Sequence, residues 1–208
     1  MPELPEVETT RRGIEPHILG RQISAVVVRE HRLRWPVDNN LSERLVGGSF
    51  LKARRRAKYL LLDSETGTLM VHLGMSGSLR VMTREEPPMF HDHIDIHFDG
   101  GLCLRYNDPR RFGSFHWLQS DDHPLLNHLG PEPLLDNFDG AWLYNKSRGR
   151  RSSVKQFLMD GKIVVGVGNI YANEALFMAG IRPDRAAGRV ALSRYEALAQ
   201  AVKRKLKG

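Results

Sequence analysis

The sequence predicts an α+β protein in which an N-terminal helix and an antiparallel β-sandwich precede an all-helical domain. Short runs with β-type alternation fill the stretch from residue 23 to about 118, and helical patterns dominate beyond residue 141. A segment rich in Pro, Gly and Asp separates the two patterns. We therefore expect an N-terminal domain at 1–120, a connection at 121–140 and a helical domain at 141–208.

The first element is a helix at about residues 4–15. Leu4, Val7, Ile14 and Ile18 recur on one helical face, and Pro16 is expected to end or kink the helix. The strands then follow as short apolar runs separated by turn signals such as 99–101, the pattern of hairpins. The expected strand segments are "ISAVVVRE", "KYLLLDS", "TLMVHLGMSGSLRVM", "HIDIHF", "LCLRY" and "GSFHWL".

Three helices are expected in the C-terminal part. "SSVKQFLMDG" predicts a helix that ends at Gly161, and "GNIYANEALFMAG" predicts one with Asn169 as N-cap and Gly180 at its end. Ser193 and Glu196 form a capping box that would start the last helix.

Composition limits the function classes. The 208 residues are 41% hydrophobic, carry a formal charge of +7 and have a pI near 9.8, which favours a polyanionic partner: nucleic acid first, an anionic membrane surface second. Cys103 is the single cysteine, which excludes an intrachain disulfide and a multi-thiolate zinc site. The sequence shows no charged-then-apolar leader and no long apolar run, so we expect a soluble, cytoplasmic protein.

The opening "MPELPEVETT" has two interpretations. Pro5 and Glu6 suit the first turn of a helix, but that explains Pro2 poorly. With Met1 removed, Pro2 is a secondary amine, a nucleophile whose addition to an aldehyde gives an iminium. Glu3 would then be a neighbouring general acid or base.

Two loop sequences could contact a ligand. "HLGMSGSLR" places His72 and Met75 beside glycines, so Met75 is either a wedge between bases or an ordinary core methionine. "NDPRRFGSF" places Arg110 and Phe112 at a turn, where they could hold and stack on a base, or form a plain turn.

Two basic stretches could contact phosphate. "LKARRRAKYLLL" leads to Lys58 and is either a charged strand edge or a phosphate-binding surface. The second stretch carries cations from 146 to Lys155, followed by glycines and Asn169 at a helix start, a ready phosphate site, although a helical packing module with a solvated charge run would look similar.

The stretch "HDHIDIHF" alternates polar side chains. His91, His93, Asp95 and His97 would lie on one strand face, where they could bind a transition metal. Because nothing nearby supplies ligands from another element, we favour a polar face of the sandwich and expect no metal site.

Several motifs together resemble the bacterial formamidopyrimidine-DNA glycosylase family, in order and at similar spacing over nearly the whole chain. They are "PELPEVET", "RRAKYLLL", "HLGMSGSLR", "DPRRFG", "HLGPEPL" and "GVGNIYANEALF". The related endonuclease VIII branch begins with a "PEGPE"-like sequence, so Leu4 favours the branch that acts on oxidised purines.

The resemblance implies a base-excision repair DNA glycosylase and abasic-site lyase that removes 8-oxoguanine and formamidopyrimidines. The partner would be double-stranded DNA with oxidised purines or abasic sites, bound by a monomer at the nucleoid. The implied catalytic residues are Pro2, which forms an imine with the sugar, together with Glu3, Glu6 and Lys58. The implied DNA-binding residues are His72, Met75, Arg110, Phe112, Lys155 and Asn169, the last in a helix–two-turn–helix element.

The resemblance also implies a C-terminal zinc finger with four cysteines in full-length members. The sequence given has no such finger, so we expect no cofactor in this chain. A non-catalytic or weakly active DNA-binding remnant is therefore the alternative. A third hypothesis, an isomerase of small keto acids that uses Pro2 as a base, would not need the cations at 146–155.

Overall fold

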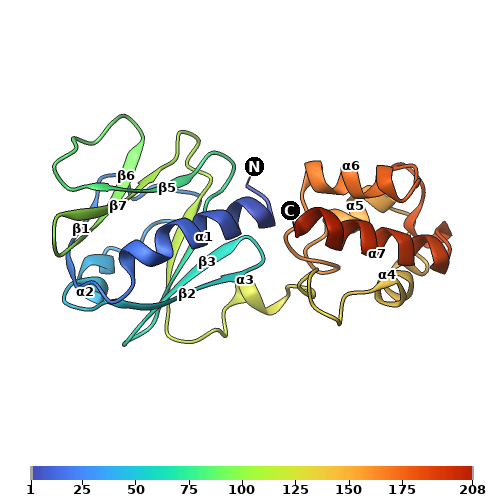
Figure 1. The fold of residues 1–208 in the computed structure, drawn as a ribbon, viewed down its shortest axis with the longest axis horizontal. Helices are drawn as coiled ribbons and strands as arrows, with labels where there is room; N and C mark the ends of the chain where they lie inside the picture. The colour runs from blue at the N-terminus through green and yellow to red at the C-terminus, as the bar shows by residue number, and fades with distance from the viewer. Residues whose placement is uncertain (1, 208) are drawn as a thin grey trace. The chain divides into compact units, whose positions relative to one another are not determined.

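The computed structural model describes residues 2–207, which divide into two compact units. Pro2 and residues 6–123 form the first unit, and Glu3–Pro5 with 124–207 form the second. The predicted α+β class, with a β-sandwich and a helical domain, is confirmed (Figure 1).

The first unit is an antiparallel sandwich of two four-stranded sheets. One sheet has the order β1-β6-β7-β5, and the other has the order β2-β3-β4-β8. The strands are β1 (Ile23–Val28), β2 (Phe50–Arg56), β3 (Tyr59–Ser64), β4 (Thr68–His72), β5 (Ser78–Thr83), β6 (Asp92–Phe98), β7 (Leu102–Asn107) and β8 (Ser114–Leu118). One core includes side chains of both sheets, such as Leu62 and Val71 from one and Ile96 and Leu104 from the other.

Helix α1 (Leu4–Ile18) precedes the sandwich and buries the four predicted apolar residues. The helix does not end at Pro16 but continues to Ile18. Pro16 offers no N–H to the carbonyl one turn earlier, and the helix ends two residues beyond it. The short α2 (Leu41–Leu45), which the sequence patterns did not indicate, buries Leu41 and Leu45.

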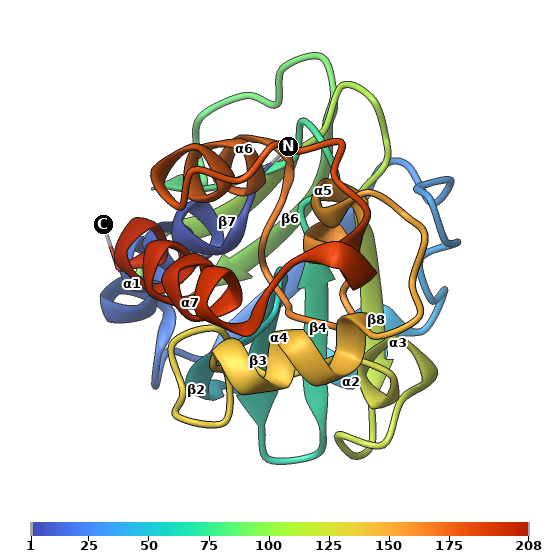
Figure 2. The ribbon, with the colours of Figure 1, turned by 90° about the vertical axis from the view of Figure 1, so that its right-hand side faces the viewer.

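The second unit contains the remaining helices: α3 (Pro124–Asn127), α4 (Gly140–Ser147), α5 (Val154–Met159), α6 (Asn169–Met178) and α7 (Leu192–Leu206), with a 3₁₀ turn at Ala187–Arg189. Helix α7 packs against both α4 and α6 (Figure 2). The hydrophobic core of the second unit includes Phe157, Leu176, Tyr195 and Leu198.

Two predicted helix caps are wrong. Gly168 is the N-cap of α6 and Asn169 is the first helical residue, since the N–H of Ala172 donates to the carbonyl of Gly168. Helix α7 begins at Leu192 with Ala191 as N-cap, because the N–H groups of Arg194 and Tyr195 donate to the Ala191 carbonyl. The capping box expected at Ser193 therefore does not start this helix.

Candidate active site and nucleic-acid interface

The N-terminal residues are held by backbone contacts of the second unit. The N–H of Leu4 donates to the carbonyl of Gly166 (3.1 Å), and Leu4 is buried in the helical core. Pro2 is half-buried, and Glu6 is exposed in the first turn of α1. Met1, whose removal would free the Pro2 amine, lies outside the described residues.

Glu3 is almost completely buried, and its carboxylate caps α6. The Oε2 atom accepts hydrogen bonds from the N–H groups of Gly168 (2.8 Å) and Tyr171 (3.3 Å), and Oε1 accepts one from Ile170 (2.9 Å). A side chain at position 168 would not fit, since a Cβ there would lie 2.5 Å from Glu3 Cδ. The carboxylate therefore satisfies backbone donors that a helix start leaves free.

The other predicted residues of the second unit lie near helix starts. Asn169 opens α6 with an exposed side chain, and Lys155 is half-buried in the first turn of α5, whose N-cap Ser153 accepts from the N–H of Gln156. In the cationic stretch before α5, Lys146 lies over the ring of Trp142 and Arg148 over that of Tyr144. These cation–π contacts hold the two charged groups against the faces of the rings.

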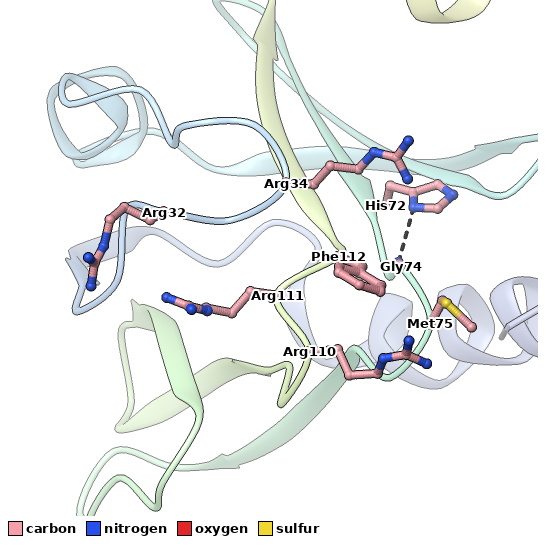
Figure 3. A pocket seen from close by; sticks show the side chains of 8 residues that line it. All are labelled: Arg32, Arg34, His72, Gly74, Met75, Arg110, Arg111 and Phe112. Atoms are coloured by element: carbon pink, nitrogen blue, oxygen red, sulfur yellow. Dashed lines mark hydrogen bonds between the residues drawn. The ribbon is translucent and has the colours of Figure 1, made fainter.

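A hollow of about 630 Å³ in the first unit brings several predicted residues together. Its lining residues are Arg32, Arg34, His72, Gly74, Met75, Arg110, Arg111 and Phe112 (Figure 3). Met75 is 42% exposed and Phe112 40% exposed, unlike core side chains. The guanidinium of Arg110 lies 4.7 Å from the centre of the Phe112 ring. Two large apolar groups thus face solvent beside cations.

His72 is a neutral member of this hollow. Burial, and next the charge of Lys58 in the turn between β2 and β3, lower its pKa to about 4. The N–H of Gly74 donates to Nδ1 of His72 (3.0 Å, Figure 3), so Nδ1 is the acceptor and Nε2 carries the proton. His72 can therefore donate a hydrogen bond from Nε2 at neutral pH.

The hollow also contains Arg32 and Arg34, which no sequence pattern indicated. Arg111 belongs to the "DPRRFG" turn, whose two arginines were expected to hold phosphate or a base edge. Glu30 pairs with both Arg32 (2.9 Å) and Arg111 (3.2 Å), and Arg111 has a positive φ of 55°. Strand alternation could not have found Arg32 and Arg34, because residues 33–35 form a bend and the two side chains point in different directions (Figure 3).

The polar stretch of β6 does not form a good metal site. Among residues 2–207, Asp95, His97 and Cys103 are buried with ligand atoms within 4.8 Å of one another. However, Arg29 and Arg105 both pair with Asp95, and burial raises the pKa of the Cys103 thiol to about 11. Two guanidinium groups and a protonated thiol oppose a cation.

The other two residues expected on this strand face, His91 and His93, are not part of that cluster. His91 precedes β6, and Nε2 of His93 donates to the carbonyl of Asp108 (2.8 Å).

No helix within the described part of the chain is both long and apolar enough to cross a membrane.

Comparisons with known proteins agree with the fold. A family profile described as the formamidopyrimidine-DNA glycosylase N-terminal domain matches residues 1–115, and one described as the H2TH domain of the same enzyme matches residues 129–208. The chain is 60% identical over 205 residues to a formamidopyrimidine-DNA glycosylase of Nitrosococcus oceani, covering 98% of this chain and 76% of the relative. It is 62% identical over 197 residues to that of Cellvibrio japonicus, covering 94% and 72%.

Solved structures give the same result. The Lactococcus lactis enzyme bound non-covalently to DNA with an abasic site matches with a TM-score of 0.92 and 31% identity, over 99% of this chain and 80% of that one. Its complex with DNA that contains a formamidopyrimidine matches with a TM-score of 0.92 and 32% identity, over 99% and 78%. The fold and these matches define a DNA repair enzyme of the glycosylase/lyase class. The chain belongs to the formamidopyrimidine-DNA glycosylase family.

Proposed function

We propose that this chain excises oxidised purines, 8-oxoguanine and formamidopyrimidines, from double-stranded DNA and then cleaves the abasic site. The observation that carries the proposal is the hollow of the first unit, where Met75, Arg110 and Phe112 are exposed beside cations. Exposed apolar side chains among arginines suit insertion into a base stack and contact with phosphate. The DNA-bound structures of similar proteins support this choice of partner.

Glycosylases rotate the target nucleotide out of the duplex, and the proposed steps begin there. Met75, Arg110 and Phe112 fill the space that the lesion leaves. His72 donates from Nε2 to a phosphate, and Lys58 lies near the target phosphate. In the second unit, Lys155 in the first turn of α5 and Asn169 in the first turn of α6 bind phosphates of the DNA backbone.

The chemistry starts at the Pro2 amine. Its lone pair attacks C1′ while the bond from C1′ to the base breaks, and the base leaves with that electron pair and takes up a proton. The Pro2 nitrogen then loses its N–H proton, and its lone pair opens the sugar ring as O4′ is protonated, which gives an iminium between Pro2 and C1′. Glu3 exchanges protons at the sugar in these steps, and Glu6 supports the site.

Elimination then cleaves the strand. Loss of a proton from C2′ expels the 3′ phosphate, and a second elimination expels the 5′ phosphate. Hydrolysis of the imine frees the enzyme and leaves a gap of one nucleoside with phosphate at both ends.

Incision of a duplex with a single 8-oxoguanine tests the function. We expect the chain to cut at the lesion and to leave phosphate on both ends, as seen on a denaturing gel. The matched control carries one extra glycine before Pro2, which turns the amine into an amide without a nucleophilic lone pair. Equal incision by that control would contradict the role of Pro2, and binding without incision by the unaltered chain would favour a non-catalytic DNA-binding protein.

A further inference from the structure

Asp108 is a fully buried carboxylate that the proposed chemistry does not use. It lies just after β7 at the start of the turn that carries Arg110 and Phe112, and its exposed fraction is 0%. A buried carboxylate is costly unless hydrogen bonds satisfy its oxygens, so its partners indicate what it holds.

The carboxylate joins three segments. Its Oδ1 atom accepts a hydrogen bond from Ser76 Oγ (2.7 Å), in the loop after β4. Its Oδ2 atom accepts from Tyr106 Oη (2.8 Å) and from the N–H of Gly113 (2.9 Å), at the far end of the turn. Ser76 continues the network, because its Oγ also accepts from the N–H of Arg110 (3.2 Å).

The backbone of Asp108 is fixed as well. Its N–H donates to the carbonyl of His91 (3.1 Å), and its carbonyl accepts from the N–H of Arg111 (3.2 Å) and from Nε2 of His93 (2.8 Å). Asp108 therefore cannot shift without breaking bonds to the segment before β6 and to its own turn.

The two loops also lie backbone against backbone. A Cβ at Gly74 would be 2.4 Å from the nitrogen of Gly113, and one at Gly113 would be 2.6 Å from the carbonyl oxygen of His72. Only glycine permits this approach. Met75 follows Gly74 directly, so the contact fixes its place relative to Phe112 (Figure 3).

We propose that Asp108 is a positioning residue that holds Met75, Arg110 and Phe112 as one preformed wedge, with Ser76 as the link between the two loops. A wedge already ordered in the free protein loses little conformational entropy when it enters the duplex. This inference rests on the proposed function, in which the three side chains replace the extruded base.

Ser76→Ala tests the link between the two loops most selectively. It removes the hydrogen bond from Ser76 Oγ to Asp108, while the hydrogen bonds of Asp108 with Tyr106 and Gly113 remain. The matched control is Ser49→Ala, which removes another serine-to-carboxylate bond of the same unit, to Glu65 (2.9 Å). Asp108→Asn is the second variant, since its amide offers one acceptor oxygen where the carboxylate offers two.

The first readout needs no DNA. In hydrogen exchange of the free protein, we expect Ser76→Ala to speed exchange in both 73–77 and 109–113, while Ser49→Ala leaves both segments unchanged. Unchanged exchange in Ser76→Ala and Asp108→Asn would overturn the proposal, whatever the activity.

The second readout is single-turnover excision. We expect Ser76→Ala to slow excision of 8-oxoguanine about tenfold, a loss on the scale of a misplaced group. Cleavage of a preformed abasic site should change less than about twofold, since no base has to be extruded. In a Met75→Ala background, Ser76→Ala should have little further effect, because residues that act as one unit are not additive.

Equal slowing on both substrates, or full additivity with Met75→Ala, would overturn the positioning role. An unaltered chain that protects both segments yet never excises a base would instead contradict the proposed function, while the exchange data would still decide whether Asp108 joins the two loops.

Discussion

At the scale of single residues, His72 shows how burial selects one form of a side chain. A charged imidazole would be the obvious ligand for phosphate, yet burial and the nearby charges of Lys58 and Arg34 keep it neutral at pH 7. The N–H of Gly74 fixes the tautomer, so the proton lies on Nε2. His72 therefore contributes a directed hydrogen bond and leaves charge to the arginines.

The lowered pKa of His72 predicts acid sensitivity. Between pH 6.5 and about 4 the unfolded chain binds a proton at this site that the folded chain does not, so stability falls as pH falls. The loss from this group amounts to about 3 kcal/mol at pH 4. His72→Asn keeps an acceptor for Gly74 but removes the titration.

Urea unfolding at pH 7 and pH 4.5 measures the difference. We expect the free energy of unfolding to fall less with pH in His72→Asn than in the unaltered chain. Some dependence remains, since burial also lowers the pKa of His97 and His116. An identical pH dependence would show that His72 is not the neutral group described above.

At the scale of elements, the start of α6 takes its cap from a distant part of the chain. The N-cap Gly168 has no side chain, and Glu3 supplies the acceptor oxygens, 165 positions away. Asp139 caps α4 in the usual way, by accepting from the N–H of Trp142 three residues on. The two caps can be compared directly.

Glu3→Gln should destabilise the second unit. The amide keeps one acceptor oxygen and turns an NH₂ group toward backbone N–H donors, which should lower the free energy of unfolding by about 1–3 kcal/mol. Asp139→Asn should change it by only a few tenths, since asparagine caps as well as aspartate. Urea unfolding of both variants tests this, and equal effects would show that Glu3 is not a structural cap.

At the scale of the whole molecule, the net charge of +7 predicts that affinity for DNA falls steeply with salt. Each neutralised phosphate contributes about 0.9 to the slope of log affinity against log salt. Lys155→Ala should lower the slope by about that amount in fluorescence anisotropy. Arg44→Ala, which removes a charge paired with Asp38, should leave it unchanged. Equal slopes for the two variants would place the phosphate contacts elsewhere.

Local patterns predicted much of this molecule. The spacing of Leu4, Val7, Ile14 and Ile18 predicted the buried face of α1, and alternation predicted most strands of the sandwich. Contacts between distant residues carry no local pattern. Two such contacts are the hydrogen bonds of the Glu3 carboxylate to the start of α6 and the hydrogen bond between Ser76 and Asp108. The first explains why Asn169 is not the N-cap. The roles of the predicted site residues remain predictions.

Borohydride trapping shows most directly whether the Pro2 amine attacks the sugar. The chain is mixed with an abasic-site duplex and sodium borohydride, which reduces the imine to a stable amine, and the adduct is located by peptide mass spectrometry. We expect a covalent adduct on the nitrogen of Pro2, and none when a glycine precedes Pro2. An adduct on a lysine, or strand cleavage without any adduct, would contradict it.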